Sequence, residues 1–318
     1  MLKISIVVPT FNEENNIEEF LYLLLNQSYS ADEILICDGD SSDKTVSIIN
    51  KIKDKNDIIK IVKRKGKCRG SGRNSAIKEA KNDFIALIDA GTKPKLNWLE
   101  QLVKSLKNNN SVECIYGSVT PLVISDFTEC LSVFFTGKKT YNGRITRSVA
   151  SIIISKKLWK NIGGFPESKK NKFVVEDLIF LENIEKNKYK FIENFNAEVF
   201  WMLPDNLTDV FNKFKVYFYG GLFTGHAKKI TTLRNLILNL VFISLSLTYN
   251  IFFLFFIFFY HLLRSNSYFN NSYWIKKSFN LNTIKKYILV SLQLLVIDIA
   301  TYYGLIKYYI MLKWIKSQ

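Results

Sequence analysis

Short apolar runs alternate with longer amphipathic stretches over the first two thirds of the chain, up to about residue 204. The runs have the length of buried strands, and the stretches between them repeat apolar residues at helical spacing. The expected strands are 4–8, 34–37, 58–62, 84–88 and 112–116, and the expected helices are 12–27, 43–53, 72–81 and 98–107. This alternation predicts an α/β domain with a parallel sheet covered by helices, whose ligand binds outside the carboxyl ends of the strands.

The pattern changes after Pro204. We therefore expect three parts: a domain over 1–204, an amphipathic segment over 205–230 and a hydrophobic helical region over 231–318. In the amphipathic segment, an aromatic face beside lysines suits a helix lying in a membrane interface, although a helix docked on a protein core would show the same face. That face consists of Leu207, Phe211, Phe214 and Phe218.

The hydrophobic region holds two apolar runs. Residues 235–263 contain no Asp, Glu, Lys or Arg. As one helix they would reach about 43 Å, more than the roughly 30 Å hydrocarbon core of a bilayer. We expect this run to be transmembrane, with a break near Asn250 as the alternative. The run 287–306 is expected to be a second span, or an interfacial helix because it carries Gln293 and Asp298.

The connection between the two runs, 264–286, carries five basic residues. If both runs cross the bilayer, this connection faces away from the N-terminal domain, which contradicts the positive-inside rule. Either the second run does not span, or the first forms a re-entrant hairpin.

Charge and cysteine content narrow the class of protein. The 318 residues include 44 Lys+Arg and 28 Asp+Glu, a net charge of +16 that favours an anionic lipid surface. Ten basic residues and two acids lie between Lys51 and Arg73, but no nucleic-acid-binding motif accompanies them, so we expect no nucleic-acid partner. The cysteines lack CxxC spacing, which argues against a zinc site. Four cysteines in a chain of this length do not form a disulfide framework, so we expect reduced thiols in the cytosol. They are Cys37, Cys68, Cys114 and Cys130.

Polar residues follow the ends of the expected strands. Thr10 follows the first strand, Asp38 the second and Asp89 the fourth. A carboxylate in such a place can accept from a nucleotide base or a ribose hydroxyl, or bind a metal. Asn12 is expected to cap the first helix. A capped turn accounts for residues 41–43 but not for Asp38.

Two further groups of charged residues lie at the starts of expected helices. Arg73 lies in Gly-rich, basic sequence at the start of a helix, which suits a phosphate. Glu176 and Asp177 open a later helix, where acids are favoured by the helix dipole and where one of them could act as a general base.

In order, these motifs read PTFNEE, DGDSSDKT, GRN, IDAG with TKPKLNWL, GGFPE and VVED. Over residues 1–204 the chain resembles the family 2 glycosyltransferases, inverting enzymes with the GT-A fold, a Rossmann-like fold of nucleotide-diphospho-sugar transferases. The resemblance implies that Asp177 is the catalytic base, with Glu176 beside it. It also implies that Asp89 contacts ribose and the metal-bound diphosphate, and that Asp38 binds the base. The other implied nucleotide-sugar-binding residues are Pro9, Thr10, Glu13 and Arg73.

Two departures from the family pattern affect these expectations. Gly91 replaces the second acid of the DxD motif, which is usually the direct metal ligand, and residues 200–202 contain no His. A Mn²⁺ or Mg²⁺ ion would therefore rest on Asp89, or basic side chains would stabilise the leaving diphosphate in its place. The Q/RxxRW motif of processive synthases is also missing, which argues against long-chain polymer synthesis.

The function expected from the resemblance is inverting transfer of a sugar from a nucleotide-diphosphate sugar to a hydroxyl acceptor. The expected acceptor is a lipid-linked glycan at the membrane, with the catalytic domain on the cytoplasmic side. Two alternatives are a polyprenyl-phosphate sugar synthase and a non-catalytic, membrane-anchored nucleotide-sugar-binding protein.

Overall fold

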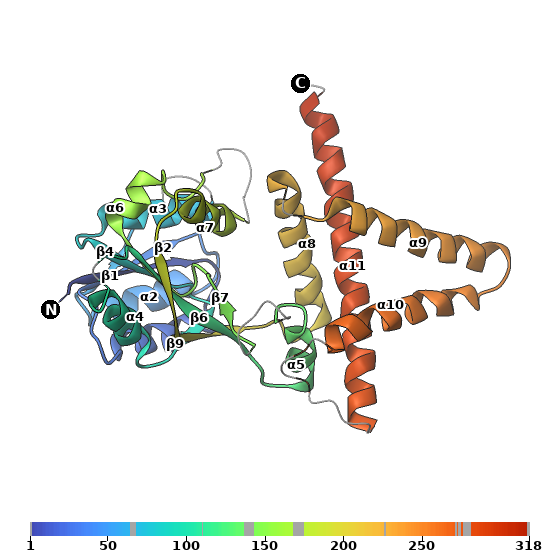
Figure 1. Ribbon diagram of the computed structural model, residues 1–318, viewed down its shortest axis with the longest axis horizontal. Helices are drawn as coiled ribbons and strands as arrows, with labels where there is room; N and C mark the ends of the chain where they lie inside the picture. The colour runs from blue at the N-terminus through green and yellow to red at the C-terminus, as the bar shows by residue number, and fades with distance from the viewer. Residues whose placement is uncertain are drawn as a thin grey trace. The chain divides into compact units, whose positions relative to one another are not determined.

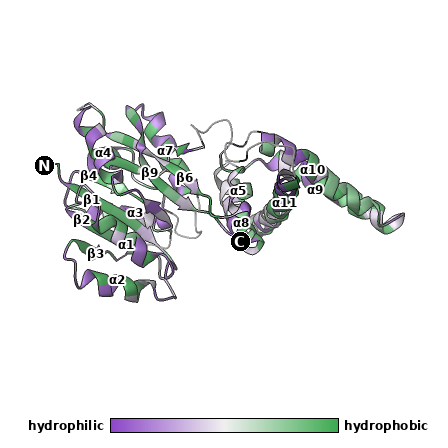
Figure 2. Ribbon diagram, turned by 90° about the horizontal axis from the view of Figure 1, so that it is seen from below, coloured by the Kyte–Doolittle hydropathy of each residue, from purple (hydrophilic) through white to green (hydrophobic). Residues whose placement is uncertain are grey.

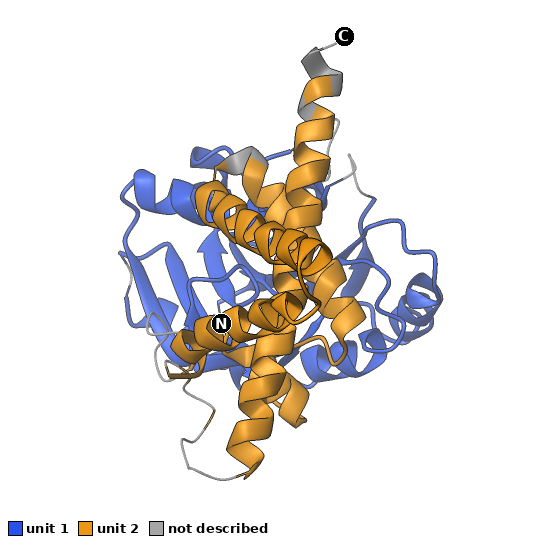
Figure 3. Ribbon diagram, turned by 90° about the vertical axis from the view of Figure 1, so that its right-hand side faces the viewer, with its two compact units in different colours: residues 1–122, 144–202 blue, residues 123–143, 203–318 orange. Residues whose placement is uncertain are grey.

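The computed structural model describes residues 2–63, 68–109, 111–136, 143–167, 175–225, 227–270, 272, 275 and 281–316. The chain forms two compact units (Figure 3). The first unit contains residues 1–122 and 144–202, and the second contains 123–143 and 203–318. The expected domain over 1–204 thus differs from the first unit, because the segment 123–143 groups with the C-terminal helices.

The first unit is a mixed sheet covered by helices on both faces (Figure 1). Its described strands follow the order β3-β2-β1-β4-β8-β6-β9-β5, and β7 pairs with β6. The strands are β1 Ile4–Thr10, β2 Glu33–Asp38, β3 Ile59–Ile61, β4 Phe84–Leu87, β5 Thr92–Pro94, β6 Cys114–Leu122, β7 Ile145–Thr146, β8 Ile152–Ser155 and β9 Phe191–Met202. The helices are α1 Ile17–Leu25, α2 Thr45–Lys53, α3 Arg69–Glu79, α4 Trp98–Lys107, α6 Lys156–Asn161 and α7 Glu176–Lys186.

The first four expected strands pair in parallel, as predicted, around a central β1. The prediction of a wholly parallel sheet was wrong, because β8 lies between β4 and β6 and runs antiparallel to both. Apolar side chains cover both faces of the sheet. One core packs α1, α2 and α4 on the sheet, and the other packs α3, α6 and α7 on its opposite face. At about 25 cal/mol per Å² of buried apolar surface, these two cores are the main source of the unit's stability.

Helix α3 is buried although its sequence is polar. Ser71, Gly72, Asn74 and Ser75 are all buried in it. Small side chains let the helix lie close to its neighbours, so tight packing rather than an apolar stripe fixes it in place.

The second unit is helical. Its helices are α5 Asp126–Ser132, α8 Leu207–Thr224, α9 Lys229–Thr248, α10 Phe253–Asn270 and α11 Leu281–Lys316. Helix α8 lies along α11, and an ideal Cβ on Gly304 would be 3.2 Å from the Phe218 ring, so glycine permits this close crossing. Phe211 contacts Tyr303, with ring centroids 6.1 Å apart. The aromatic face of α8 therefore packs on a protein helix.

Two helices of the described chain are long and apolar enough to cross a membrane, Lys229–Thr248 and Leu281–Met311. The expectation of one continuous helix over 235–263 was wrong. The run breaks near Asn250, where the Asn250 side chain accepts the Phe252 amide (2.8 Å) and its carbonyl accepts the Phe253 amide (3.0 Å). Helices α9 and α10 consequently form an antiparallel hairpin that extends from α11, green along most of its length in Figure 2.

Candidate active site

The expected polar residues gather at the carboxyl ends of β1, β2 and β4. Thr10 and Asp38 are register partners at the ends of adjacent strands, and Pro9 is paired with Cys37 one residue earlier. Asp89 lies two residues beyond the end of β4, on the other side of β1. Thr10 is buried, and its hydroxyl has no hydrogen-bond partner among the described residues.

Two loops at this edge are fastened to each other. Asn12 has a φ of 53°, its amide donates to the Ser41 hydroxyl (2.8 Å), and its side-chain oxygen accepts the Ser42 amide (2.9 Å). Asn12 therefore does not cap a helix, and the expectation that it does was wrong, since α1 begins at Ile17.

The turn after β2 also involves the carboxylate of Asp38. The amide and hydroxyl of Ser41 donate to the two oxygens of Asp38, at 2.8 and 2.6 Å. Asp38 is thus part of the turn. A carboxylate accepts about four hydrogen bonds, so Asp38 retains acceptor capacity toward a ligand.

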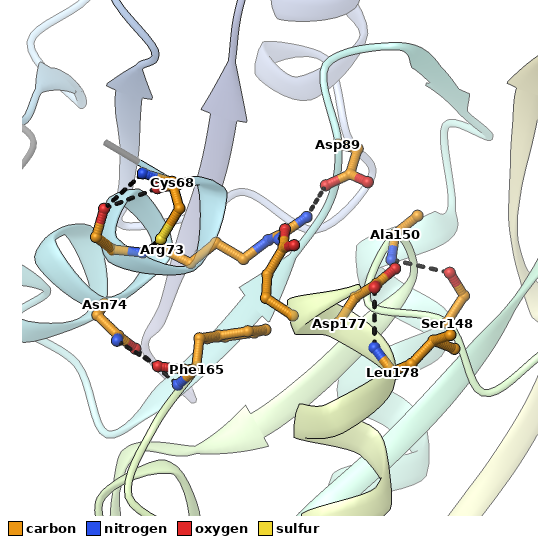
Figure 4. A network of polar contacts seen from close by, with 11 residues as sticks. Cys68, Arg73, Asn74, Asp89, Ser148, Ala150, Phe165, Asp177 and Leu178 are labelled. Atoms are coloured by element: carbon orange, nitrogen blue, oxygen red, sulfur yellow. Dashed lines mark hydrogen bonds and ion pairs between the residues drawn. The ribbon is translucent and has the colours of Figure 1, made fainter. Parts of the chain in front are cut away.

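Arg73 joins three elements at the centre of the site (Figure 4). Its Nη2 lies 2.8 Å from Asp89 Oδ1 and its Nη1 lies 2.9 Å from Glu176 Oε1. The side chains of Arg73 and Glu176 are both 2% exposed, whereas that of Asp89 is 36% exposed. The guanidinium also lies over the Phe165 ring, 5.3 Å from its centroid. A single buried cation therefore connects α3, the loop after β4 and the start of α7.

The GRN and GGFPE motifs hold that cation in place. The Asn74 side chain donates to the Phe165 carbonyl and accepts the Phe165 amide, both at 2.9 Å. Its oxygen also accepts the Trp159 indole N–H at 3.0 Å. An ideal Cβ on Gly70 would lie 2.4 Å from the Pro166 carbonyl, so only glycine lets α3 approach this segment. These residues form a scaffold around Arg73.

The two acids that open α7 have different surroundings. Asp177 is half-buried, and its Oδ1 accepts the amide of Leu178 at 2.9 Å. Burial raises the pKa of Asp177, and Arg73 opposes this rise. Burial likewise raises the pKa of Glu176 against the same opposing arginine. Glu176 Oε2 has no partner among the described residues. Asp177 is thus partly exposed to solvent, whereas Glu176 is enclosed beside Arg73.

Gly91 borders a carboxylate from a distant part of the sequence. An ideal Cβ on Gly91 would lie 3.5 Å from Glu13 Oε1, so Glu13 lies next to the space that a second DxD acid would enter. Burial raises the pKa of Glu13, and a hydrogen bond from Asn16 opposes the rise. Within the described residues, no three His, Cys, Asp or Glu side chains are grouped to hold a metal ion by themselves.

Arg69, the exposed first residue of α3, was not singled out as a site residue. Its charge lowers the pKa values of Glu13, Glu176 and Asp177, which shows that it lies in the field of all three. Its spacing of four residues from Arg73 was the available signal, since such residues share a helix face. Residues 64–67 of the basic stretch, Val174 of the VVED motif and His226 are outside the described residues.

The strand order 3-2-1-4, with acids at the carboxyl ends and an antiparallel extension, agrees with the GT-A fold expected from the sequence. Residues 5–121, less than half of the chain, match the sequence model described as Glycosyl transferase family 2. The expected family and fold class are therefore confirmed.

Similar proteins bear this out. "Probable glycosyltransferase YdaM" of Bacillus subtilis (strain 168) is 34% identical over 121 residues, 36% of this chain and 29% of that protein. An Escherichia coli protein named "UDP-Glc:alpha-D-GlcNAc-diphosphoundecaprenol beta-1,3-glucosyltransferase WfgD" is 33% identical over 116 residues, 36% of this chain and 45% of that protein. The chain thus spans less than half the length of either relative.

Solved structures show the same fold. Residues 1–349 of S. aureus TarS, in complex with UDP-GlcNAc, give a TM-score of 0.50 at 20% identity, covering 70% of this chain and 67% of that one. Mannosyltransferase PcManGT from Pyrobaculum calidifontis, in complex with GDP-Man and Mn²⁺, also gives 0.50 at 20% identity, covering 71% and 65%.

Proposed function

We propose that this protein is an inverting glycosyltransferase that moves a sugar from a nucleotide-diphosphate sugar to a hydroxyl group. The observation that carries the proposal is the arrangement of Asp177. It is a half-buried carboxylate with a raised pKa, beside an arginine that is tied to the strand-end Asp89. A general base needs both access to the acceptor and a pKa closer to the working pH, and the partial exposure and raised pKa of Asp177 support this role.

In the proposed reaction, Asp177 takes the proton of the acceptor hydroxyl. The acceptor oxygen forms a bond to the anomeric carbon while the bond from that carbon to the diphosphate oxygen breaks. The nucleoside diphosphate leaves with the electron pair, so the configuration inverts. Thr10, Glu13 and Asp38 would line the nucleotide pocket with Pro9.

Arg73 and Glu176 would act by positioning. Arg73 is almost fully buried and is already paired with two carboxylates. Glu176 is too enclosed to reach an acceptor, so its carboxylate anchors Arg73 at the start of α7. The pair would hold Asp177 and Asp89 at a fixed separation, which is the condition for a well-oriented displacement.

The charges of the site favour a divalent cation. Arg73 faces Asp89 and Glu176, and Asp177 and Glu13 add two further carboxylates, while the donor brings a diphosphate. Asp89 and Glu13 are the carboxylates that fit Mn²⁺ or Mg²⁺ here, because Mg²⁺ is bound through one or two carboxylates together with substrate phosphates. A bound cation would neutralise the leaving diphosphate, and Arg69 would contribute to the same effect.

The proposed acceptor is a lipid-linked glycan at a membrane. The names of WfgD and of a Methanococcus voltae relative, 36% identical over 106 residues, contain a diphosphoundecaprenol and a dolichyl phosphate. The exposed apolar helices of the second unit support a membrane location. All four cysteines are free and buried, which agrees with a catalytic domain on the reducing, cytoplasmic side.

Product analysis tests the proposal. Full-length protein in lipid would be given a radiolabelled donor with either a polyprenyl-diphosphate glycan or a polyprenyl phosphate. A new glycosidic bond to a sugar hydroxyl, of configuration opposite to the donor's, is expected. A sugar–phosphate–lipid product would show a polyprenyl-phosphate sugar synthase instead. Donor binding without any product would show a non-catalytic binding protein, the alternative suggested by Gly91 in place of the second DxD acid.

A further inference from the structure

The α9–α10 hairpin exposes an apolar surface that a water-soluble protein rarely shows. From Leu240 to Tyr260, all of which the structure describes, no residue is buried. Seventeen of these 21 residues are aliphatic or aromatic, and the other four are uncharged. Near the turn, Leu247 is 82% exposed and Ile251 is 76% exposed. Exposed apolar patches of this size indicate contact with a membrane or a protein.

Charge divides the hairpin into a tip and a base. The tip, residues 235–263, has no charged residue. The base carries Lys228, Lys229 and Arg234 where the chain enters α9, and Arg264, whose charge Asp298 compensates, where it leaves α10. Basic residues beside an apolar surface complement anionic lipid headgroups, each contributing about 1 kcal/mol near the surface. This pattern favours a bilayer over a protein as the partner.

The uncharged parts of the two helices are too short to cross. On α9 the stretch from Asn235 to Thr248 is about 21 Å long, and on α10 the stretch from Phe253 to Leu263 is about 16 Å long, at about 1.5 Å per residue. Both fall short of the roughly 30 Å hydrocarbon core. If α9 spanned at its full length, Arg234 would lie inside the core, where a charged side chain is costly.

A cluster of polar residues fixes the hairpin to α11 next to its base. Asp298 of α11 accepts from His261 Nε2 (3.1 Å), from both terminal nitrogens of Arg264 and from the Tyr302 hydroxyl (3.3 Å). The side-chain amide of Asn239 on α9 donates to the same Tyr302 hydroxyl at 2.8 Å. We call these five residues the polar clasp. The clasp pairs the charged groups of Arg264 and Asp298 within the protein, close to the ends of the charge-free segment, as a bilayer requires. Asn239 Oδ1 alone among the clasp's side-chain atoms is buried without a partner among the described residues.

We propose that the α9–α10 hairpin inserts tip-first into a lipid bilayer and returns to the same face without crossing it. Lys228 and Arg264 then lie at one membrane surface, and the basic connection from 264 onward begins on the side where α9 starts. This arrangement removes the conflict with the positive-inside rule that two full spans create. It is independent of the proposed transferase activity.

Cysteine accessibility tests the topology in the full-length protein. The four native cysteines are buried, so the unmodified chain measures background. Asn250→Cys reports the tip, and Ile230→Cys and Asn266→Cys report the base, where both residues are exposed. A membrane-impermeant maleimide would be added to right-side-out and inside-out membrane vesicles. Both base cysteines are expected to react in the same vesicle orientation, and the tip cysteine in neither until detergent is added.

Three results would overturn the proposal. Labelling of the tip in the orientation opposite to that of Ile230→Cys would mean that α9 crosses the bilayer. Labelling of the tip as readily as the base would place it in water. Cross-linking of Asn250→Cys between two chains, unaffected by removal of lipid, would make a second copy the partner of this surface.

A matched set of charge variants gives a second readout. Leu247→Glu with Ile251→Glu puts two charges in the tip, and Ile230→Glu puts one at the base, where Ile230 is 86% exposed. All three side chains are exposed, so folding should be unaffected. The tip variant is expected to bind vesicles of 3:1 phosphatidylcholine and phosphatidylglycerol at least tenfold more weakly, and Ile230→Glu within about twofold of the unmodified protein. Equal weakening would contradict tip-first insertion.

Discussion

Each unit contains an arginine that bridges elements through carboxylate groups, and the two clusters differ in how completely their charged groups are paired. In the second unit, Arg264 and His261 both bind Asp298, and a tyrosine hydroxyl adds a further bond. In the first unit, Arg73 binds Asp89 and Glu176, yet Glu176 Oε2 and the Arg73 Nε have no partner among the described residues.

The net charges differ as well. Arg264 and Asp298 compensate each other, whereas Arg73 is outnumbered by Asp89, Glu176 and Asp177. A closed, balanced cluster has little left with which to bind a ligand, so it serves to hold helices together. An open cluster with excess negative charge at the ligand-binding edge of a sheet is suited to catalysis and to a cation. Substitutions in the two clusters should therefore affect different properties.

The largest effect is expected for Asp177→Asn. Losing the general base should lower turnover roughly 10²–10⁴-fold while nucleotide binding and stability remain near those of the unmodified protein. Steady-state rates and nucleotide titration measure this. Asp54→Asn, an exposed position at the end of α2, is the matched control and should be neutral. A rate for Asp177→Asn within a few-fold of the unmodified rate would remove Asp177 from the mechanism.

Arg73→Met should destabilise the first unit by about 3–5 kcal/mol, because Glu176 would remain buried without a counter-charge. Arg73→Met combined with Glu176→Met should be markedly more stable than Arg73→Met alone, yet inactive. Urea unfolding followed by tryptophan fluorescence gives both values. Additive losses in the double variant would mean that the two residues are not coupled.

Asp298→Asn should destabilise the second unit by about 1.5–3 kcal/mol, the typical worth of hydrogen bonds to a charged group. Nucleotide binding by the first unit should not change. Thermal unfolding in detergent and nucleotide titration of the same sample separate the two effects. A loss of nucleotide affinity that matches the loss of stability would argue against the division into a structural and a catalytic cluster.

Gly70→Ala should destabilise the first unit by about 1–3 kcal/mol, since the new Cβ would lie only 2.4 Å from the Pro166 carbonyl oxygen. Gly91→Ala serves as its control, because the nearest atom there is Glu13 Oε1 at 3.5 Å, an ordinary contact. Gly91→Asp should tighten Mn²⁺ binding if the cation lies between Asp89 and Glu13. Isothermal titration with Mn²⁺ and UDP or GDP tests this last point, and unchanged affinity would contradict the placement.

The smallest effect concerns pH. The raised pKa of Asp177 places the acid limb of kcat/KM above the value near 4 of an ordinary aspartate. Activity falls as the pH decreases through that pKa, because the base becomes protonated. Arg69 lowers this pKa, so Arg69→Gln should move the acid limb to higher pH, whereas Lys78→Gln on the same helix should not. A shift to lower pH would contradict the assignment.

The same raised pKa has a consequence for stability. The folded protein binds the Asp177 and Glu176 protons more tightly than the unfolded chain does. Their contribution to stability is therefore lost as the pH rises through the raised pKa values.

Local patterns in the sequence were enough to predict much of the first unit. Helix α4 occupies the predicted range, and the strand ends deliver Asp38 and Asp89 where expected. Strand β9 was missed because polar and apolar residues mix along it, and β8 because its apolar run is only three residues long. Neither sequence nor spacing reveals an antiparallel strand inserted between β4 and β6.

The sequence predicts which residues form the site better than it predicts the contacts between them. Glu13 and Gly91 are neighbours although 78 positions separate them, and the bonds of Asn12 to the 41–42 turn are equally non-local. The difference between Asp177 and Glu176 depends on burial, which two adjacent acids in a sequence do not disclose. The break at Asn250 was foreseen as an alternative, because asparagine is a common turn residue.

The most direct test of the account is nucleotide release by the purified full-length protein in lipid. A panel of UDP- and GDP-sugars would be incubated with Mn²⁺, Mg²⁺ or EDTA, with and without a polyprenyl-diphosphate glycan, and nucleotide binding would be measured in parallel. The account predicts release from one donor that depends on the metal and is accelerated by the acceptor. Absence of both release and binding for every donor, under all of these conditions, would contradict it.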